Sequence, residues 1–268
     1  MTTNPDAPVL LEISEGVATV SLNRPRAMNA LAEDVLATLQ DIWDGLATNT
    51  DVKAVVLRGA GDHFCAGHNL KEMTARRQDT DGGKRYFNEL FAQCSKMMMS
   101  IVELRQPVIA EVTGIATAAG CQLVATCDLA VASEDARFAT SGVNIGLFCS
   151  TPMVALSRNV GRKQAMEMLL LGDFVPAEKA VEIGLINKVV PHADVGKAAR
   201  ELARKIVSKA PVAIKIGKRA FYEQAEMSLA DAYTYTGAAM AENMMARDTE
   251  AGIEAFIAKK PMPDWGGQ

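Results

Sequence analysis

The sequence lacks a cysteine framework, an excess of basic charge and a rich supply of aromatic residues. Only five cysteines occur among 268 residues, and none is spaced as C-x-x-C. An odd number of thiols without such spacing argues against a disulfide scaffold and favours a reducing compartment. Aromatic residues make up 5% of the chain and the net charge is −4, so we expect no general affinity for nucleic acid.

The sequence also lacks a secretory signal, a membrane-spanning run and a nucleotide-binding motif. Its first residues, MTTNPDAPV, have neither a basic start nor a long apolar core, so we expect a cytoplasmic protein. Its long apolar stretch, residues 108–128, contains Glu111, Gln122 and Asp128 and has no flanking basic cluster, so we expect no membrane span. No Walker A or G-x-G-x-x-G pattern supports nucleotide hydrolysis or a Rossmann cofactor.

The stretch from Val108 to Asp128 predicts a strand, a tight loop and the start of a helix. β-Branched residues follow Pro107, a break comes at Gly114, and small residues lead through Gly120 into helix-compatible sequence. Small side chains allow close approach to the main chain, and the free N–H groups of a first helical turn favour negative charge. Such a turn can hold an oxyanion. The alternative is a buried strand and helix without chemistry.

The remaining pattern predicts an α/β fold with two regions. Val9–Ile13 and Val17–Leu22 are typical of a β-hairpin. Strand-like runs recur after helical connections, which favours parallel β–α crossovers; they lie near Val55, Val108, Leu129 and Ile186. After Asp194 the pattern is only helical. We therefore predict a mixed spiral core in residues 1–208 and a helical region in residues 209–268 that packs on a partner subunit.

Two loops that follow strands present backbone N–H groups: Ala66-Gly67-His68 and Ala118-Ala119-Gly120. If they converge, they form a two-donor oxyanion hole, which a thioester carbonyl needs as it becomes an enolate or a tetrahedral oxyanion. A metal site is the alternative for His63, Cys65 and His68. A fourth ligand is missing, so we expect no metal.

Several sequence blocks resemble the signatures of the crotonase (enoyl-CoA hydratase/isomerase) superfamily. Their order and spacing match across almost the whole chain: Leu22–Pro25, Phe64–Gly67, Leu70–Glu72, Gly120–Cys121, Cys127–Asp128, Glu178–Leu185 and Phe256–Pro261. The fuller string Ala116–Asp128, together with Phe138–Thr140 and Gly146–Pro152, is similar to the subgroup called enoyl-CoA hydratase domain-containing protein 3.

The resemblance implies a crotonase-like spiral of ββα turns and a C-terminal helical region that assembles a homotrimer or a dimer of trimers. It also implies an acyl-CoA thioester as substrate, with coenzyme A as part of that substrate and no further cofactor. The oxyanion donors would be the backbone N–H groups of His68 and Ala119. The CoA contacts would be Arg26, Ala27, Ala66, His68, Asn69, Leu70, Lys71 and Gly120, and weaker candidates for phosphate and acyl contacts are Lys218, Arg219 and Phe221.

The chain departs from the family at two catalytic positions. Hydratases of this family use one glutamate directly after the Gly-Cys of the central helix and another in an F-x-x-P-E segment, whereas this chain has Gln122 and Gly142 there. Glutamine can orient a water but has no useful acid–base equilibrium near neutral pH, and glycine has no side chain. The unaltered two-glutamate mechanism is therefore not expected, and isomerisation, thioester hydrolysis and decarboxylation stay open.

Another residue would have to move the proton. Glu111 lies on the strand before the oxyanion loop, where burial would raise its pKa; the alternative is an ion-paired structural role. The His68 imidazole is a second candidate, and Ser141, Asn144 and Cys149 are polar groups that can bind substrate or water. Two hypotheses follow: an acyl-CoA enzyme of the hydratase/isomerase type, or a non-catalytic acyl-CoA binding or assembly protein.

Overall fold

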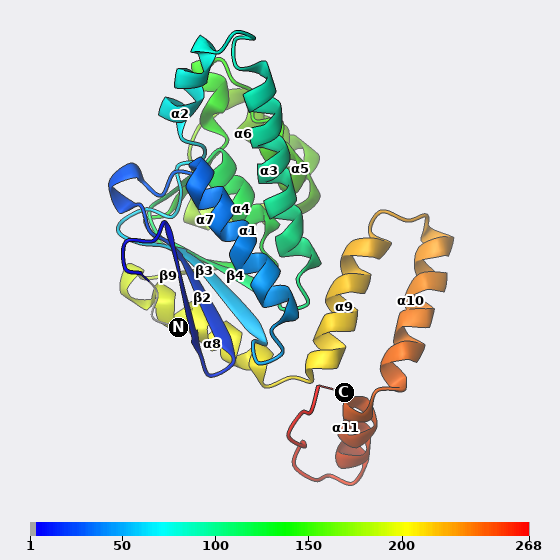
Figure 1. Cartoon of the computed structure of the whole chain (residues 1–268). Coiled ribbons are helices and arrows are strands. Elements are labelled where there is room, and N and C mark those ends of the chain that lie inside the picture. The colour runs from blue at the N-terminus through cyan, green and yellow to red at the C-terminus, as the bar shows by residue number, and fades with distance from the viewer. Residues whose placement is uncertain (1–3, 268) are drawn as a thin grey trace.

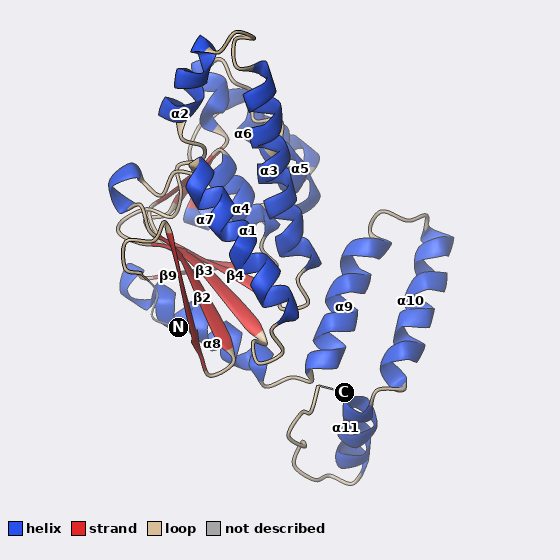
Figure 2. Ribbon diagram, viewed as in Figure 1, coloured by secondary structure: helices blue, strands red, loops and turns tan. Residues whose placement is uncertain are grey.

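A computed structural model describes residues 4–267, so residues 1–3 and 268, which the predicted domain ranges include, lie outside the described residues. Figures 1 and 2 show a sheet with helices on both faces and a group of helices that extends from it. The strands are β1 (Val9–Ser14), β2 (Val17–Leu22), β3 (Ala54–Gly59), β4 (Val108–Val112), β5 (Ile115–Thr117), β6 (Leu129–Ser133), β7 (Arg137–Ala139), β8 (Val175–Pro176) and β9 (Lys188–Val190).

Helices are interspersed among these strands as far as β9, and the helices after β9 follow one another without a strand in the described residues. They are α1 (Glu33–Thr48), α2 (Leu70–Ala75), α3 (Lys84–Glu103), α4 (Ala119–Thr126), α5 (Pro152–Asn159), α6 (Arg162–Leu171), α7 (Ala177–Glu182), α8 (Val195–Val207), α9 (Pro211–Gln224), α10 (Leu229–Met244) and α11 (Arg247–Ile257). The purely helical pattern predicted after Asp194 is confirmed within the described residues.

The main sheet has six strands within residues 4–267, in the order β1-β2-β3-β4-β6-β9. β1 and β2 pair antiparallel as the predicted hairpin, and every later pair in this sheet is parallel. Parallel neighbours need crossover connections, which the helices between them supply. The predicted β–α crossovers are therefore confirmed.

The two faces of this sheet are covered by different helices. Val108, Ala110 and Val112 of β4 pack into the main core with residues of α1, α3 and α4, whereas Ile109 packs with Ala199 of α8. Figure 1 shows α1 on one side of the sheet and α8 on the other. Because side chains alternate along a strand, each residue of β4 belongs to one of these two layers.

A second sheet of three short strands, in the order β5-β7-β8, lies beyond the carboxyl end of β4. Its first strand is joined to the chain after β3 by an isolated parallel bridge between Cys65 and Ala116. The Cys65 N–H donates to the Ile115 carbonyl at 3.1 Å, and the Thr117 N–H donates to the Cys65 carbonyl at 3.0 Å. These bonds bring two segments that are about fifty residues apart in sequence into register.

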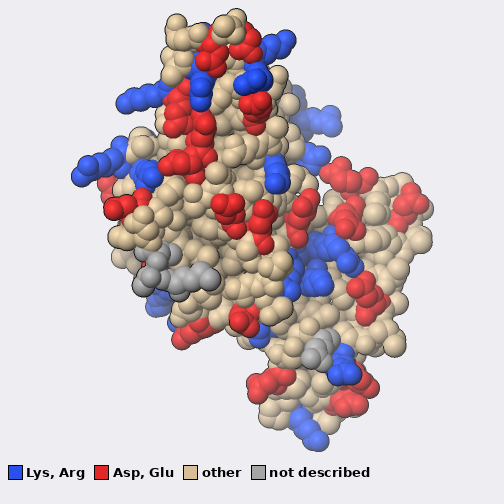
Figure 3. Space-filling model, in the orientation of Figure 1, with Lys and Arg blue, Asp and Glu red and all other residues tan. Residues whose placement is uncertain are grey.

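The helices α9, α10 and α11 extend away from the sheet, and Figure 1 shows α9 and α10 side by side. They expose many large apolar side chains: Phe221, Leu229, Tyr233, Met240, Met244, Met245, Ile253, Phe256 and Ile257. Figure 3 shows basic side chains gathered over α9 and acidic ones near the turn between α9 and α10. In the part of the chain that the structure describes, no helix is long and apolar enough to cross a membrane.

Candidate functional site

The loops Ala66–His68 and Ala118–Gly120, called the two donor loops below, lie against each other. A Cβ atom built on Gly67 would lie 3.0 Å from the Ala118 Cβ and 3.2 Å from the Ala119 backbone nitrogen. A Cβ on Gly120 would overlap the Cys65 carbonyl oxygen. Glycine is therefore required at both positions because the two main chains touch there.

The backbone geometry of the donor loops leaves two N–H groups outside the hydrogen bonds that hold the loops in place. Leu31 N–H donates to the Gly67 carbonyl at 2.7 Å, Asn69 N–H donates to the Leu31 carbonyl at 3.2 Å, and Ala118 N–H donates to the Ala139 carbonyl at 2.9 Å. None of these bonds uses the N–H of His68 or of Ala119. Ala119 opens α4, and the first N–H groups of a helix have no acceptor within it.

Ala118 has an unusual backbone conformation, with φ of 51° and ψ of −119°. A positive φ is unfavourable for a residue with a Cβ, and such strain of about 1–3 kcal/mol is typical of functional sites. Its carbonyl accepts a hydrogen bond from the Gln122 N–H at 3.1 Å, which starts the helix directly after the strained residue. Both the N–H and the carbonyl of Ala118 are therefore hydrogen-bonded, which fixes the turn that orients the Ala119 N–H.

The His68 side chain packs on α3 and is largely buried. Its ring meets Phe91 edge to face, with centroids 5.5 Å apart and planes at 88°. Burial lowers the pKa of the His68 imidazole to about 4, because the charged form loses its hydration. The imidazole, named above as a candidate for moving the proton, is therefore neutral at pH 7.

Gln122 lies one turn into α4 and is 5% exposed. Its Oε1 atom is buried without a hydrogen-bond partner, as is Nε2 of His68. Four residues further along the same helix face, the Thr126 hydroxyl contacts the Met98 sulfur of α3 at 3.7 Å. Gln122 therefore faces α3 as well, since residues four apart share one side of a helix.

Gly142 lies in the short 3-10 helix η3 (Ser141–Ile145), where the chain folds back on itself. A Cβ at this position would overlap the Leu147 carbonyl oxygen and lie 3.0 Å from the Cys149 sulfur. Ser141 is hydrogen-bonded to Thr117, with 2.8 Å between the two hydroxyl oxygens, so η3 is tied to the strand that precedes Ala118. The space for a side chain at position 142 is filled by residues 147–149.

The Cys149 thiol, which lies beside Gly142, is buried. Burial raises the pKa of the Cys149 thiol, partly opposed by a hydrogen bond to the Gly142 backbone. The thiol is therefore protonated at neutral pH. Sequence reasoning named Cys149 only as a minor candidate, because the turn that returns it to Gly142 has no clear sequence signal.

Glu111 does not lie at the donor loops. It shares the α8 face of β4 with Ile109, and Gly196 of α8 is close enough that a Cβ there would lie 3.3 Å from Glu111 Oε1. Arg58 is its partner on β3. Burial raises the pKa of Glu111, while Arg58 and Arg200 oppose this change. The position of the carboxyl on the α8 face of the sheet, near Arg58 and Arg200, favours the structural role over that of proton carrier.

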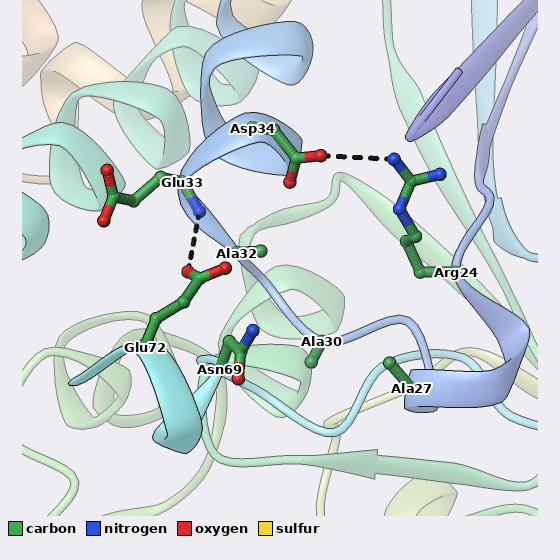
Figure 4. A pocket seen from close by; sticks show the side chains of 8 residues that line it. All are labelled: Arg24, Ala27, Ala30, Ala32, Glu33, Asp34, Asn69 and Glu72. Atoms are coloured by element: carbon green, nitrogen blue, oxygen red, sulfur yellow. Dashed lines mark hydrogen bonds and ion pairs between the residues drawn. The ribbon is translucent and has the colours of Figure 1, made fainter. Parts of the chain in front are cut away.

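A cavity of about 420 Å³ opens beside the donor loops (Figure 4). It is lined by Arg24, Ala27, Ala30, Ala32, Glu33, Asp34, Asn69 and Glu72. Arg24 is paired with Asp34 at 3.2 Å, and the Glu72 carboxylate accepts a hydrogen bond from the Glu33 N–H at 3.2 Å. Two of the predicted CoA contacts, Ala27 and Asn69, thus line one cavity.

The other predicted contacts are not among the residues that line this cavity, and they differ in exposure. Arg26, Leu70 and Lys71 are exposed, Ala66 is half-buried, and Gly120 is buried. The Ala66 N–H donates to the Met28 carbonyl at 3.0 Å, which joins the loop of Arg26 to the first donor loop. The Asn69 side chain accepts from the Lys71 N–H at 3.1 Å and caps α2.

Asn29 is a positioning residue that sequence reasoning missed. It is 1% exposed, and its amide nitrogen donates to the carbonyls of Ala60 at 2.9 Å and His63 at 2.7 Å. Its amide oxygen accepts from the Arg24 N–H at 2.9 Å. These bonds hold the Arg24–Asn29 turn against the chain that leads into the first donor loop. The available signal was an asparagine two residues before the apolar run that begins at Leu31.

Lys218 does not contribute a phosphate contact. Its side chain is 6% exposed, and its ammonium donates to Asp128 at 2.8 Å and to the carbonyls of Ile101 at 2.9 Å and Gln106 at 3.0 Å. Tyr222 donates to the other Asp128 oxygen at 2.9 Å. Arg219 pairs with Glu242 at 3.0 Å. These groups fasten α9 to the core and to α10.

Within the described residues, no group of three or more His, Cys, Asp or Glu side chains is arranged to hold a metal ion.

Comparison with known proteins gives consistent results. The family model described as "Enoyl-CoA hydratase/isomerase" matches residues 12–268. The human protein named "Enoyl-CoA hydratase domain-containing protein 3, mitochondrial" is 44% identical over 251 residues, covering 94% of this chain and 81% of that protein. The short-chain-enoyl-CoA hydratase of Clostridium acetobutylicum is 34% identical over 94% of this chain and 95% of its own.

A solved structure has the same fold. The crystal structure of an enoyl-CoA hydratase from Mycobacterium smegmatis superposes with a TM-score of 0.91 at 49% identity, covering 96% of this chain and 98% of the other. The predicted crotonase-like α/β fold is thereby confirmed. The predicted similarity to the domain-containing protein 3 subgroup is also confirmed by the human relative.

The prediction of a cytoplasmic location is wrong. The human relative is named as a mitochondrial protein, and so are its counterparts from Xenopus laevis and Rattus norvegicus. The prediction rested on the lack of a secretory signal. Signals for import into an organelle have a different composition from a secretory signal, so that criterion does not address them.

Proposed function

Because this chain belongs to the enoyl-CoA hydratase/isomerase family, within the crotonase superfamily, we propose that it binds an acyl-CoA thioester and acts on it through an enolate. The backbone N–H groups of His68 and Ala119 hold the thioester carbonyl oxygen. As the enolate forms, negative charge grows on this oxygen, and donors that already point at it stabilise that charge without reorganisation.

The observation that carries this proposal is the contact between the two donor loops. Gly67 lies against the Ala119 nitrogen, and neither the His68 N–H nor the Ala119 N–H is used in the bonds that fix the loops. Two unused donors on touching loops, one of them at a helix start, are suited to an anionic oxygen.

The cavity beside the loops is suited to the uncharged parts of coenzyme A. Its carboxylates, Glu33, Asp34 and Glu72, accept hydrogen bonds, while Arg24 is already paired with Asp34. The amide N–H groups of the pantetheine arm and the adenine amino group are donors that match such a lining. The phosphates are repelled from the carboxylates, so we place them at the exposed Arg26 and Lys71.

The proton chemistry differs from that of a two-glutamate hydratase. Gln122 orients a water or a polar substituent but transfers no proton, and position 142 offers no side chain. The Cys149 thiol beside Gly142 is the titratable group nearest this position in the described chain, and it is protonated at neutral pH. It can deliver a proton to an enolate carbon. Isomerisation, thioester hydrolysis and decarboxylation fit this set better than rapid hydration.

The experiment has two arms. Raman difference spectroscopy of a bound thioester with a ¹³C-labelled carbonyl should show the C=O stretch at lower frequency than in water, since two donors polarise the bond. Turnover of crotonyl-CoA is measured on the same preparation. A tightly bound thioester with an unshifted carbonyl contradicts the proposed oxyanion hole, whereas a shifted carbonyl supports it whichever reaction is found.

A non-catalytic acyl-CoA binding role is the second candidate. The observation that favours it is the filling of the space beside Gly142 by Leu147 and Cys149. A shifted carbonyl together with turnover no faster than the uncatalysed reaction, for crotonyl-CoA and for a malonyl-type thioester, would support this second role.

We also propose that the chain assembles into a homotrimer or a dimer of trimers through α9, α10 and α11. The large apolar side chains that these helices expose in the single chain support this assembly. Large exposed apolar surface is typical of protein interfaces.

A further inference from the structure

Thr117 lies between the two donor loops and contacts the chain on both sides. Its N–H donates to the carbonyl of Cys65, directly before the first donor loop, at 3.0 Å. A Cβ atom built on Gly67 would lie 3.2 Å from the Thr117 carbonyl oxygen. Ala118, whose φ is 51°, comes next and leads to Ala119, whose N–H is the second proposed donor. The position of Thr117 therefore sets where the strained turn begins.

The strand pairing that holds Thr117 ends at this residue. Thr117 is the last residue of β5 and is paired with Ala139, the last residue of β7. Beyond this pair neither chain continues as a strand, because one enters the turn at Ala118 and the other enters η3 through Thr140. The hydroxyl oxygens of Thr117 and Ser141 are 2.8 Å apart. A hydrogen bond between side chains thus joins the two segments where the strand pairing has ended.

This hydroxyl pair is not a feature of the F-x-x-P-E segment. Phe138 is the first residue of the corresponding segment here, so Ser141 stands at the position of the proline and Gly142 at that of the glutamate. Proline has no side-chain hydroxyl and cannot form this bond. The chain thus lacks the carboxylate of that segment and has instead a hydroxyl that bonds to the strand before the second donor loop.

The contacts around Ala118 hold its strained conformation, since such a conformation persists only where the surroundings determine it. Both its N–H and its carbonyl are hydrogen-bonded, so the turn is held from Ala118 onwards. The bond to Ser141 holds the residue before the turn, Thr117, by its side chain. Only the strained residue separates Thr117 from Ala119, so a tilt of Thr117 changes the direction of the Ala119 N–H.

We propose that Thr117 and Ser141 are positioning residues that orient the Ala119 N–H towards a thioester carbonyl. This proposal rests on the proposed binding of acyl-CoA at the donor loops. Neither hydroxyl has to contact the thioester, because the pair acts through the backbone of the strained turn. Hydrogen bonds weaken steeply as the donor angle departs from linearity, so a small rotation of this turn reduces the stabilisation of the carbonyl oxygen.

Calorimetric titration of the full chain with two ligands isolates the contribution of the carbonyl. Butyryl-CoA is a thioester, and S-butyl-CoA has the same carbon chain without the carbonyl oxygen. The ratio of their dissociation constants therefore measures the effect of the two donors. We expect the wild type to bind butyryl-CoA about tenfold more tightly than S-butyl-CoA. A wild type that binds neither ligand, or binds both equally, overturns the proposed function and the inference with it.

Variants of the hydroxyl pair test the inference alone. Thr117→Val keeps the shape of the side chain without its hydroxyl, and Ser141→Ala removes the other hydroxyl. Each should lower the preference for the thioester about threefold to tenfold and move the C=O stretch of bound ¹³C-labelled butyryl-CoA back towards its frequency in water. Thr117→Ser keeps a hydroxyl and should retain both wild-type values. Because the two residues act through one bond, the double variant should lose no more than either single variant.

Ser21→Ala is the matched control. Ser21 is 5% exposed and accepts a hydrogen bond from Arg58 at 2.8 Å, between β2 and β3 and outside the donor loops. This variant should lower stability but change neither the affinity ratio nor the carbonyl frequency. A wild-type ratio in folded Thr117→Val or Ser141→Ala overturns the inference, and so does an equal loss in Ser21→Ala. If Thr117→Val does not fold, Ser141→Ala, at a half-buried position, decides alone.

Discussion

A side chain at position 142 has no room to extend, because the Leu147 carbonyl and the Cys149 sulfur occupy the place where its Cβ would lie. Such overpacking typically costs about 1–3 kcal/mol. We therefore expect Gly142→Ala to lower the free energy of unfolding by roughly that amount, as measured by urea denaturation. Adding a glutamate at this position would meet the same obstacle, so Gly142→Glu does not restore the family's second carboxylate.

Gly45→Ala is the matched control for this measurement. Gly45 lies in α1, and a Cβ there meets nothing within 4 Å. Alanine is the better helix former, so the variant should gain about 0.5–1 kcal/mol. Equal stability changes in the two variants would contradict the crowding at Gly142.

The buried imidazole of His68 makes stability depend on pH. Its pKa is about 4 in the folded chain, against 6.5 as the ordinary value. As the pH falls below 6.5, the unfolded chain takes up the proton first, so stability is lost from about pH 6.5 down to about pH 4. The loss due to this group is ~2 kcal/mol at pH 5.

His68→Phe removes this titration and keeps an aromatic ring against Phe91. Urea denaturation at pH 7 and pH 5 should show a smaller decrease for the variant than for the wild type, by about 2 kcal/mol. Because the carboxylates of both proteins titrate alike, the difference isolates the imidazole. Identical pH dependence in both would mean that His68 is solvated.

At the scale of elements, the Lys218–Asp128 pair fastens α9 to the core. Removing one member of a buried ion pair leaves the other charge without compensation, which costs about 3–5 kcal/mol. We expect Lys218→Met to lower the free energy of unfolding by that order and to accelerate amide hydrogen exchange throughout α9. Lys215→Met, at an exposed position of the same helix, should change neither quantity appreciably. Unchanged exchange in Lys218→Met would show that α9 is held by other contacts.

The sequence predicts helices and strands better than it predicts which face of a strand a side chain occupies or where the chain turns back on itself. The hairpin and the parallel strands follow from β-branched runs and helical connections. The alternation of side chains along a strand also predicts the orientation of Glu111. It is two residues from Ile109 on β4, so both side chains lie on the face covered by α8. The turn that brings Cys149 back to Gly142 was not predictable, because it depends on a close approach of backbone atoms and not on a periodic pattern.

In the candidate site, too, some features were predictable from the sequence and others were not. The glycine-containing donor loops were predicted as a pair, since small residues mark close backbone contact. The neutral state of His68 was not, because desolvation depends on what α3 places around the ring. The role of Lys218 was missed for a related reason: a lysine in a helix is usually solvated, and only the fold shows three acceptors around it.

At the scale of the whole molecule, the exposed apolar side chains of α10 predict assembly. Tyr233 and Met240 are 74% and 67% exposed in the single chain. We expect light scattering to give the wild type three or six times the mass of one chain. A Tyr233→Glu, Met240→Glu double variant should shift towards the single chain, because burying a carboxylate without a partner is unfavourable.

Ile13→Glu is the control for added charge. Ile13 is also an exposed apolar residue, at 48%, but it lies on β1 at the edge of the sheet, far from α10 in Figure 1. This variant should keep the wild-type mass. A wild type that elutes as one chain at all concentrations would contradict the proposed assembly.

Under the proposed binding of acyl-CoA, the burial of the Lys218 ammonium has a chemical consequence. Thioesters acylate free amines spontaneously, and only an amine that is uncharged and within reach of the reagent can attack. Lys218 is 6% exposed and donates hydrogen bonds to one carboxylate and two carbonyls, so it lies out of reach of the reagent, whereas exposed lysines do not. The contacts that hold α9 to the core are thereby protected from acylation by the proposed acyl-CoA substrate.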